Sequence, residues 1–177
     1  MKHSTSFIHI TAINRLFESG ETKGMKLGLS NMVTLDHALG SPSTSFAKVH
    51  VAGTNGKGSV STKIARVLQA SGKKVGLYTS PHIHTFHERI EIDGITICDE
   101  EAERLLNRIF LAADRENLKP TFFEIMTLLA FLFFAERKVE IAVLEVGLGG
   151  RLDATNIVTP LLSVITSIDF DHEHFIL

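Results

Sequence analysis

The sequence has little cysteine, little net charge and no long apolar run, and each shortage excludes a class of protein. Cys98 is the only cysteine in 177 residues, so the chain can form no internal disulfide and has no Cys-x-x-Cys pair for structural zinc. The 18 Lys and Arg residues nearly balance the 20 Asp and Glu residues. That balance argues against a nucleic-acid binder that neutralises phosphates with an open basic face. These shortages predict a cytoplasmic protein without a nucleic-acid partner.

Hydrophobic residues are spread along the chain in short segments. The longest apolar run, Met126–Ala135, is far shorter than the roughly 20 residues that cross a bilayer. Residues 1–20 have no continuous apolar core of the kind that a secretory signal needs. Hydrophobic residues at 44% and charged residues at 21% match the averages of soluble globular chains. We expect one folded domain without a membrane span.

Apolar periodicity and cap residues predict the order of helices and strands. Helices are expected over residues 8–19, 32–39, 60–71, 99–117 and 121–137, and strands over residues 47–52, 75–78, 141–144 and 161–165. Asp99 and Thr121 are the expected N-caps of the last two helices. Asp93-Gly94, between alternating isoleucines, predicts a hairpin with a type I′ turn.

The pattern of these elements predicts the fold class. Residues 47–78 form a strand, loop, helix and strand, which is a βαβ unit with parallel strands. Residues 141–144 and 161–165 are continuous apolar runs, typical of strands that are covered on both faces. The helix that begins at Thr121 is apolar on all sides, which implies burial between layers. We therefore predict a three-layer α/β domain with a mainly parallel sheet and a small β-hairpin.

A glycine-rich turn, Gly53-Thr-Asn-Gly-Lys-Gly-Ser59, joins the strand 47–52 to the next helix. Backbone N–H groups at such a helix N-terminus converge on one point, where the helix dipole and Lys57 favour phosphate oxygens. The strict P-loop pattern is not met, because Val51 stands where its first glycine would be and Gly58 follows the lysine. An ordinary loop with a surface lysine is the alternative, but the flanking strand and helix favour a phosphate site.

Glu145 follows directly on the apolar strand 141–144. Ligands of open α/β sheets gather at the carboxyl ends of the strands, so a carboxylate here can hold Mg²⁺ beside bound phosphates. The alternative is a solvated strand end. The apolar segment Val146-Gly-Leu-Gly-Gly150 that follows makes a solvated position unfavourable.

Histidines cluster in the segments Ser80–His87 and Asp171–His174, after the second strand and after the last one. Both segments are expected at the rim where the glycine-rich turn opens. Three of these histidines can form a zinc site, because imidazole suits zinc, and polar loop residues are the alternative.

Charged residues also occur next to apolar segments at 121–124 and 151–156. Glu124 lies at the start of an apolar helix, where a buried acid must be paired or functional unless it supports the helix N-terminus. Arg151 and Asp153 can belong to a site or form a structural ion pair in a loop.

Together these segments resemble the folylpolyglutamate synthase/dihydrofolate synthase family of the Mur ligase superfamily. The similarity runs from about Lys26–Leu29 to Asp171-His172, and it is carried by Gly53–Ser59, Thr79–His82, Glu88–Ile90, Thr121–Glu124 and Glu145–Asn156. The resemblance implies a P-loop NTPase-like domain of the Mur ligase central type over residues 1–177. It also implies truncation before the family's C-terminal domain.

The resemblance implies an ATP-dependent ligase. Such an enzyme phosphorylates the carboxylate of dihydropteroate or a folate with ATP and Mg²⁺, and the amino group of L-glutamate then attacks the acyl phosphate. The small-molecule substrates would be its only partners, with no membrane, and the parent enzyme is expected to be a monomer.

The family's motifs carry roles onto single positions of this sequence. Lys57, Glu145 and His172 match catalytic positions, and Ser80, Glu145 and His172 match the magnesium positions. The nucleotide positions are Gly53, Thr54, Asn55, Gly56, Lys57, Gly58 and Ser59, and the dihydropteroate positions are Thr121, Phe122, Phe123, Glu124, Arg151, Leu152 and Asp153.

The chain departs from the family pattern at two points. Asp169 stands where members usually have a small residue, which adds a carboxylate near the magnesium positions. Members of the family also continue into a downstream lysine that holds a second magnesium ion, and into a C-terminal domain that contacts the nucleotide and glutamate. We therefore expect weak or no ligase turnover from this chain alone. The alternatives are a nucleotide- or pterin-binding fragment and another Mur-type amide ligase, which usually has Thr after the lysine. The sequence leaves open whether the parent makes dihydrofolate, polyglutamates or both.

Overall fold

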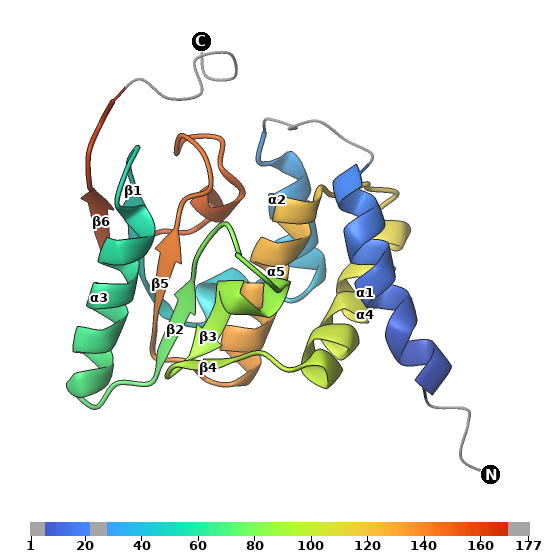
Figure 1. Ribbon diagram of the computed structural model, residues 1–177. Coiled ribbons are helices and arrows are strands. Elements are labelled where there is room, and N and C mark those ends of the chain that lie inside the picture. The colour runs from blue at the N-terminus through green and yellow to red at the C-terminus, as the bar shows by residue number, and fades with distance from the viewer. Residues whose placement is uncertain (1–5, 22–27, 170–177) are drawn as a thin grey trace.

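The computed structural model describes residues 6–21 and 28–169, which form a mixed sheet with helices on both faces (Figure 1). The helices are α1 (Ser6–Glu21), α2 (Ser30–Ala38), α3 (Lys57–Ala70), α4 (Asp99–Arg115) and α5 (Phe122–Glu136). The strands are β1 (Ala47–Ala52), β2 (Val75–Tyr78), β3 (Ile90–Ile92), β4 (Ile95–Thr96), β5 (Ile141–Glu145) and β6 (Leu162–Ile165). Short 3₁₀ helices are η1 (Pro42–Thr44), η2 (Phe86–Arg89) and η3 (Ala154–Ile157).

The sheet has the strand order β4-β3-β2-β5-β1-β6. Strands β2, β5, β1 and β6 run parallel, and the β3–β4 hairpin adds an antiparallel edge. Positive φ angles of 51° at Asp93 and 83° at Gly94 agree with the predicted I′ turn. Because β5 lies between β1 and β2, Val51 pairs with Glu145. The glycine-rich turn after β1 and the end of β5 therefore meet at one edge of the sheet.

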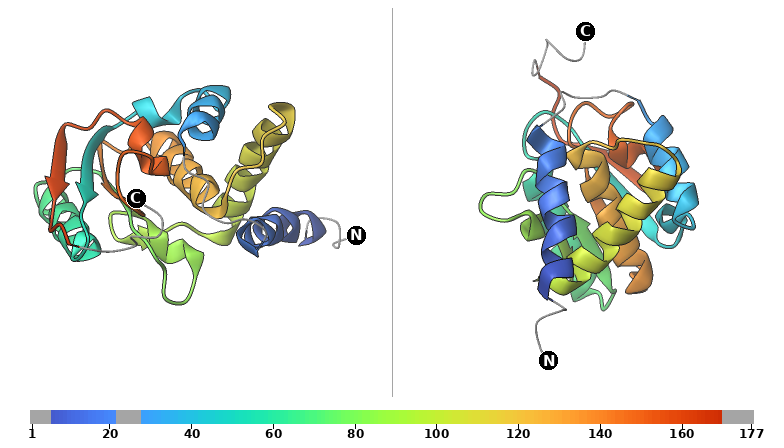
Figure 2. Two further views of the ribbon diagram at one scale, coloured as in Figure 1. Left: turned by 90° about the horizontal axis from the view of Figure 1, so that it is seen from above. Right: turned by 90° about the vertical axis from the view of Figure 1, so that its right-hand side faces the viewer.

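The helices form layers on the two faces of the sheet. Helix α3 covers one face and α5 the other, with α4 and α1 stacked outside α5 (Figure 2). Every residue from Glu124 to Phe134 is buried, so the predicted burial of this helix between layers is confirmed. The larger apolar core lies between the sheet and α5, and a smaller one lies under α3 around Val51 and Val143.

Two sequence predictions need correction, one about the start of a helix and one about the burial of a strand. Cys98, and not Asp99, is the N-cap of α4, and Asp99 lies in the first turn where its carboxylate faces the helix dipole. Strand β6 is not covered on both faces within the described residues. It pairs with β1 at the sheet edge, and the side chains of Leu162 and Ile165 are 54% and 64% exposed. An apolar run reveals what a strand can bury, but it does not reveal which layer is present to cover it.

The helices in residues 6–21 and 28–169 are each too short or too polar to cross a membrane.

Candidate functional site

The glycine-rich turn between β1 and α3 has the backbone conformation of an anion-binding loop. Gly53 and Gly56 have φ angles of 135° and 80°, which glycine adopts without steric strain, and Gly56 is the N-cap of α3. Lys57 is the first residue of the helix. Its Nζ donates hydrogen bonds to the carbonyl oxygens of Gly53 at 2.8 Å and Thr54 at 3.2 Å. The ammonium group thus closes over the turn that the sequence predicts to bind phosphate.

The segment after β6 holds the first half of this turn. The N–H of Thr54 donates to the Ser167 carbonyl at 2.8 Å, and the N–H of Asn55 donates to Ser167 Oγ at 3.1 Å. Thr166 Oγ1 donates to the Asn55 carbonyl at 2.7 Å. The first-turn N–H groups of α3 have no helical acceptor, so Gly58 and Ser59 offer donors to an anion. Thr166 and Ser167 are not among the predicted site residues, because no local motif marks them.

Glu145 lies beside the first turn of α3. Only 3% of the residue is exposed, and its Oε2 accepts a hydrogen bond from the N–H of Ser80 at 3.0 Å. A Cβ added at Gly58 would lie 3.4 Å from this same oxygen. Burial raises the pKa of Glu145, while the Ser80 N–H and the positive charges of Lys57 and Arg89 act in the opposite direction.

The donor chemistry at Glu145 fits a hard cation. Mg²⁺ prefers oxygen ligands, and a carboxylate next to the serine that follows β2 offers them at the edge where phosphates would bind. His172, the third predicted ligand, lies outside the described residues, as does the rest of Asp171–His174. Within the described ranges, no three His, Cys, Asp or Glu side chains are grouped closely enough to hold a metal.

The histidines of the segment Ser80–His87 have different partners. Nδ1 of His82 accepts a hydrogen bond from Arg89 Nε at 2.8 Å, and Nε2 of His87 lies 2.8 Å from the Asp99 carboxylate. The two rings thus have different partners, and no three potential ligands are grouped among the described residues. The described part of the chain therefore gives no support to a three-histidine zinc site.

The segment Thr121–Glu124 begins α5 with a capping box. The Thr121 hydroxyl accepts from the Glu124 N–H at 3.3 Å, and Glu124 Oε2 accepts from the Thr121 N–H at 2.6 Å. The predicted alternative for Glu124, support of the helix N-terminus, is thus confirmed for one oxygen. The other, Oε1, is buried without a hydrogen-bond partner among the described residues. A buried carboxylate oxygen with no donor is suited to bind an N–H group of a ligand.

Aromatic rings connect this helix start to the loop after β5. The ring of Phe123 lies 6.1 Å from that of Tyr78, and a Cβ added at Gly147 would lie only 2.5 Å from Phe123 Cζ. The ring of Phe122 lies 6.4 Å from His82. The two segments predicted to bind the pteroate thus share one region, although Arg151 and Leu152 point outward and are exposed.

Asp153 organises the loop after β5 from inside. Its Oδ2 accepts the N–H groups of Gly147 and Leu148, each at 3.0 Å, and its Oδ1 accepts the N–H and hydroxyl of Thr155. The ion pairs of the described residues do not include one between Arg151 and Asp153, so that alternative is not supported. Asp153 is instead a buried acceptor for four donors.

His50 extends this network to β1. The hydroxyl of Thr155 donates its single proton to Asp153, so it must accept from His50 Nε2–H, which lies 2.8 Å away. His50 is not among the predicted site residues, because a histidine inside a short apolar strand carries no motif. The network ties the strand before the glycine-rich turn to the loop after Glu145.

A pH dependence of stability follows from the burial of His50. Burial lowers the pKa of His50, and the negative charge of Asp153 opposes that effect only in part. As the pH falls, His50 is therefore protonated near pH 6.5 in the unfolded chain but only at a lower pH in the folded chain. His50 stabilises the fold above pH 6.5, and the contribution is lost as the pH falls through the lower pKa of the folded state.

We expect the free energy of unfolding of the unsubstituted chain to fall more steeply between pH 7.5 and 5 than that of His50→Gln. Urea titrations at several pH values measure both slopes, and glutamine keeps an N–H donor for Thr155. The difference at pH 8, where His50 is neutral in both states, serves as the reference for the lost packing. Parallel curves for the two proteins would contradict the assignment.

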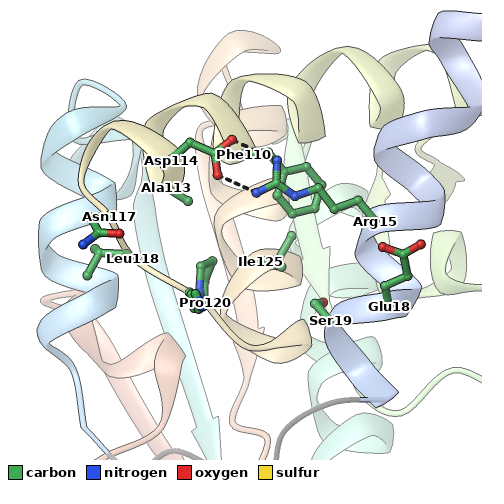
Figure 3. A pocket seen from close by; sticks show the side chains of 11 residues that line it. Arg15, Glu18, Ser19, Phe110, Ala113, Asp114, Asn117, Leu118, Pro120 and Ile125 are labelled. Carbon is green, nitrogen blue, oxygen red and sulfur yellow. Dashed lines mark hydrogen bonds and ion pairs between the residues drawn. The ribbon is translucent and has the colours of Figure 1, made fainter.

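A separate pocket of about 430 Å³ lies between α1 and the end of α4 (Figure 3). Arg15 crosses it to pair with Asp114, and Phe110 and Ile125 form its apolar wall. None of the residues predicted for the nucleotide, metal or pteroate site lines it. The site at the carboxyl edge of the sheet is therefore distinct from this pocket.

The fold and the loop after β1 agree with the comparison to protein families. The sequence model of the Mur ligase middle domain matches residues 51–176, so the chain belongs to the Mur ligase family. Within that family its curated relatives are named dihydrofolate synthase and folylpolyglutamate synthase. The chain is 52% identical over 154 residues to the dihydrofolate synthase/folylpolyglutamate synthase of Bacillus subtilis, covering 84% of this chain and 36% of that protein. It is 41% identical over 181 residues to the folylpolyglutamate synthase of Lacticaseibacillus casei, covering 98% and 40%.

Solved structures have the same fold. The folylpolyglutamate synthase of Thermotoga maritima matches with a TM-score of 0.85 and 39% identity, over 94% of this chain and 39% of that one. Escherichia coli FolC in complex with DHPP and ADP matches with a TM-score of 0.87 and 35% identity, over 93% and 40%. The chain thus spans less than half the length of these relatives.

Proposed function

We propose that this chain supplies the ATP-, magnesium- and pteroate-binding part of a ligase that joins L-glutamate to dihydropteroate or a folate. The observation that carries the proposal is that the Glu145 carboxylate, the Ser80 N–H and the first turn of α3 meet at one edge of the sheet. The Glu145 carboxylate contacts the Ser80 N–H at 3.0 Å and lies beside Gly58 in the first turn of α3. The names of the relatives, and the ADP and DHPP bound to Escherichia coli FolC, support this ligase over another Mur-type enzyme.

The reaction consists of two transfers. A carboxylate oxygen of the pteroate attacks the γ-phosphorus of ATP, the bond to the β-phosphate oxygen breaks, and ADP leaves with the electron pair. The amino nitrogen of glutamate then attacks the acyl carbon, loses a proton and expels phosphate, which leaves an amide. Two easier displacements thus replace one direct condensation.

The chain's own residues would bind and position the reactants. The first-turn N–H groups of α3 and the Lys57 ammonium bind the phosphates, for which Lys57 exchanges its loop carbonyl partners for phosphate oxygens. Glu145 and Ser80, with His172, would hold Mg²⁺. The bound cation would neutralise charge on the transferred phosphoryl group.

The pteroate would bind between the start of α5 and the loop after β5. Phe122 and Phe123 offer ring surface, and the free oxygen Oε1 of Glu124 can accept an N–H from the pterin. Asp153 acts there by fixing the backbone of Gly147 and Leu148. We also infer a cytoplasmic parent enzyme without a nucleic-acid partner, supported by the near-zero charge and the exposed free thiol of Cys98. A monomeric state is proposed from the resemblance to the family alone.

We expect Lys57→Ala to weaken the binding of a non-hydrolysable ATP analogue with Mg²⁺ at least tenfold, because a charge-assisted contact to phosphate is lost. Its stability should change little, since the neighbouring backbone contacts of Thr54 and Asn55 remain. Isothermal titration calorimetry measures the affinity, and thermal melting measures the fold. Lys63→Ala in the same helix, on its outer face, is the matched control. Unchanged affinity in Lys57→Ala would contradict the proposed nucleotide site.

A further inference from the structure

Arg89 is a buried cation at the end of η2 that the proposed reaction has not yet used. Only 8% of the residue is exposed. Its Nε donates to Nδ1 of His82 at 2.8 Å, and its guanidinium carbon lies 5.3 Å from the centre of the Phe122 ring. The positive charge of Arg89 also acts on the buried hydroxyl of Tyr78, whose pKa it lowers against the larger effect of burial. These neighbours hold the guanidinium in place, but none of them carries a negative charge.

The charge of Arg89 lacks a carboxylate at ion-pair distance. Of the arginines in the described residues, Arg15, Arg66, Arg104, Arg108 and Arg137 each pair with an acid at the surface. Arg89, Arg115 and Arg151 form no such pair, and of these three only Arg89 is buried. A buried cation is unfavourable unless an anion or several acceptors compensate it. The positive charge of Arg89 acts to lower the pKa of Glu145, but the two side chains form no ion pair. The arrangement leaves a cationic position open to an anion of a ligand.

The location of Arg89 indicates which anion this is. The guanidinium lies against Phe122, at the start of the proposed pteroate pocket. The Arg89 carbonyl accepts a hydrogen bond from the N–H of Thr79 at 3.0 Å, and the next N–H along the chain, that of Ser80, donates to Glu145 at the proposed magnesium and phosphate site. A pteroate carries its carboxylate at the end remote from the pterin ring. A substrate with its ring system along the start of α5 must bring that carboxylate toward Glu145 to accept the phosphoryl group.

We propose that Arg89 binds the substrate carboxylate that becomes phosphorylated, and holds it in line with the γ-phosphate. This inference rests on the proposed function and adds a substrate-binding residue to it. The planar guanidinium suits the two oxygens of a carboxylate, and its Nη groups are the donors left after Nε has bound His82. Arg89 keeps its proton throughout. One carboxylate oxygen forms the new bond to phosphorus, and the other stays on the guanidinium as the acyl phosphate forms.

The first test needs no substitution. The unsubstituted chain is titrated by calorimetry with dihydropteroate and with its carboxamide, which has the same shape but no charge. We expect dihydropteroate to bind about 10- to 100-fold more tightly, the range of a charge-assisted hydrogen bond. Equal affinities would overturn the role of Arg89 while leaving the pteroate pocket in place. Absence of binding by both compounds would overturn the pocket and Arg89 together, and binding of the ATP analogue would still report on the nucleotide site.

The second test assigns the preference to Arg89. The Arg89→Met variant should bind dihydropteroate and its carboxamide with equal affinity. The Arg89→Lys variant should recover part of the preference for dihydropteroate, because lysine restores the positive charge without the paired N–H donors of a guanidinium. Affinity for the ATP analogue should not change in either variant. Arg115→Met, at the exposed end of α4, is the matched control and should keep the full preference. Retention of the preference in a folded Arg89→Met would overturn the proposal, and if that variant does not fold, the unsubstituted chain decides.

Discussion

Replacement of Asp153 by alanine is expected to lower the free energy of unfolding by about 3 kcal/mol, because buried donors lose their acceptor. The N–H groups of Gly147 and Leu148 donate to Oδ2 at 3.0 Å, and the N–H and hydroxyl of Thr155 donate to Oδ1. Asp153 is only 7% exposed, so water does not replace these contacts in the folded chain. Urea denaturation measures this change, provided that the dependence of the unfolding free energy on urea concentration has the same slope in both proteins.

Two further variants show whether the buried network causes this effect. Asp153→Asn keeps acceptor capacity on one side-chain atom only, so it should fall between the unsubstituted chain and the alanine variant. Asp114→Ala removes an exposed carboxylate that also makes two contacts, both with Arg15, and it should change stability much less. Similar losses for Asp153→Ala and Asp114→Ala would contradict the role assigned to burial.

Replacement of Gly53 by alanine is expected to abolish nucleotide binding and to destabilise the fold by about 2–4 kcal/mol. Gly53 has a φ of 135°, and an added Cβ would lie 2.2 Å from Thr166 Oγ1 and 2.9 Å from the Ser167 carbonyl. Rotation of Thr166 can relieve the first contact. The second involves backbone, so the turn itself must move and the N–H groups of α3 lose their alignment.

Gly40→Ala is the control for Gly53→Ala. Gly40 also has a positive φ, 88°, but nothing lies within 4 Å of an added Cβ. Its replacement should therefore cost about 1 kcal/mol of conformational strain and leave nucleotide affinity unchanged. Calorimetry with the ATP analogue and urea denaturation provide both measurements. Normal nucleotide binding by Gly53→Ala would show that the contact with the segment after β6 is not part of the site.

Local patterns predicted most elements of the fold. The predicted helices and strands are present with ends shifted by a few residues, because apolar periodicity and caps act within one or two turns of chain. The shift from Asp99 to Cys98 at the N-cap of α4 is such an end effect. The wrong expectation for β6 has another cause, since covering a strand depends on elements remote in sequence.

The sequence by itself determined the glycine-rich turn, the acid at the end of β5, the N-cap at Thr121 and the resemblance to a ligase family, because each resides in a short contiguous motif. Only the tertiary structure decided how these motifs meet. It placed β5 between β1 and β2, set Arg89 against Phe122, and joined His50 to Thr155 across 105 positions of chain. Hydrogen bonds and charge pairs between distant segments leave no periodic signal in the sequence, so packing alone brings these residues together.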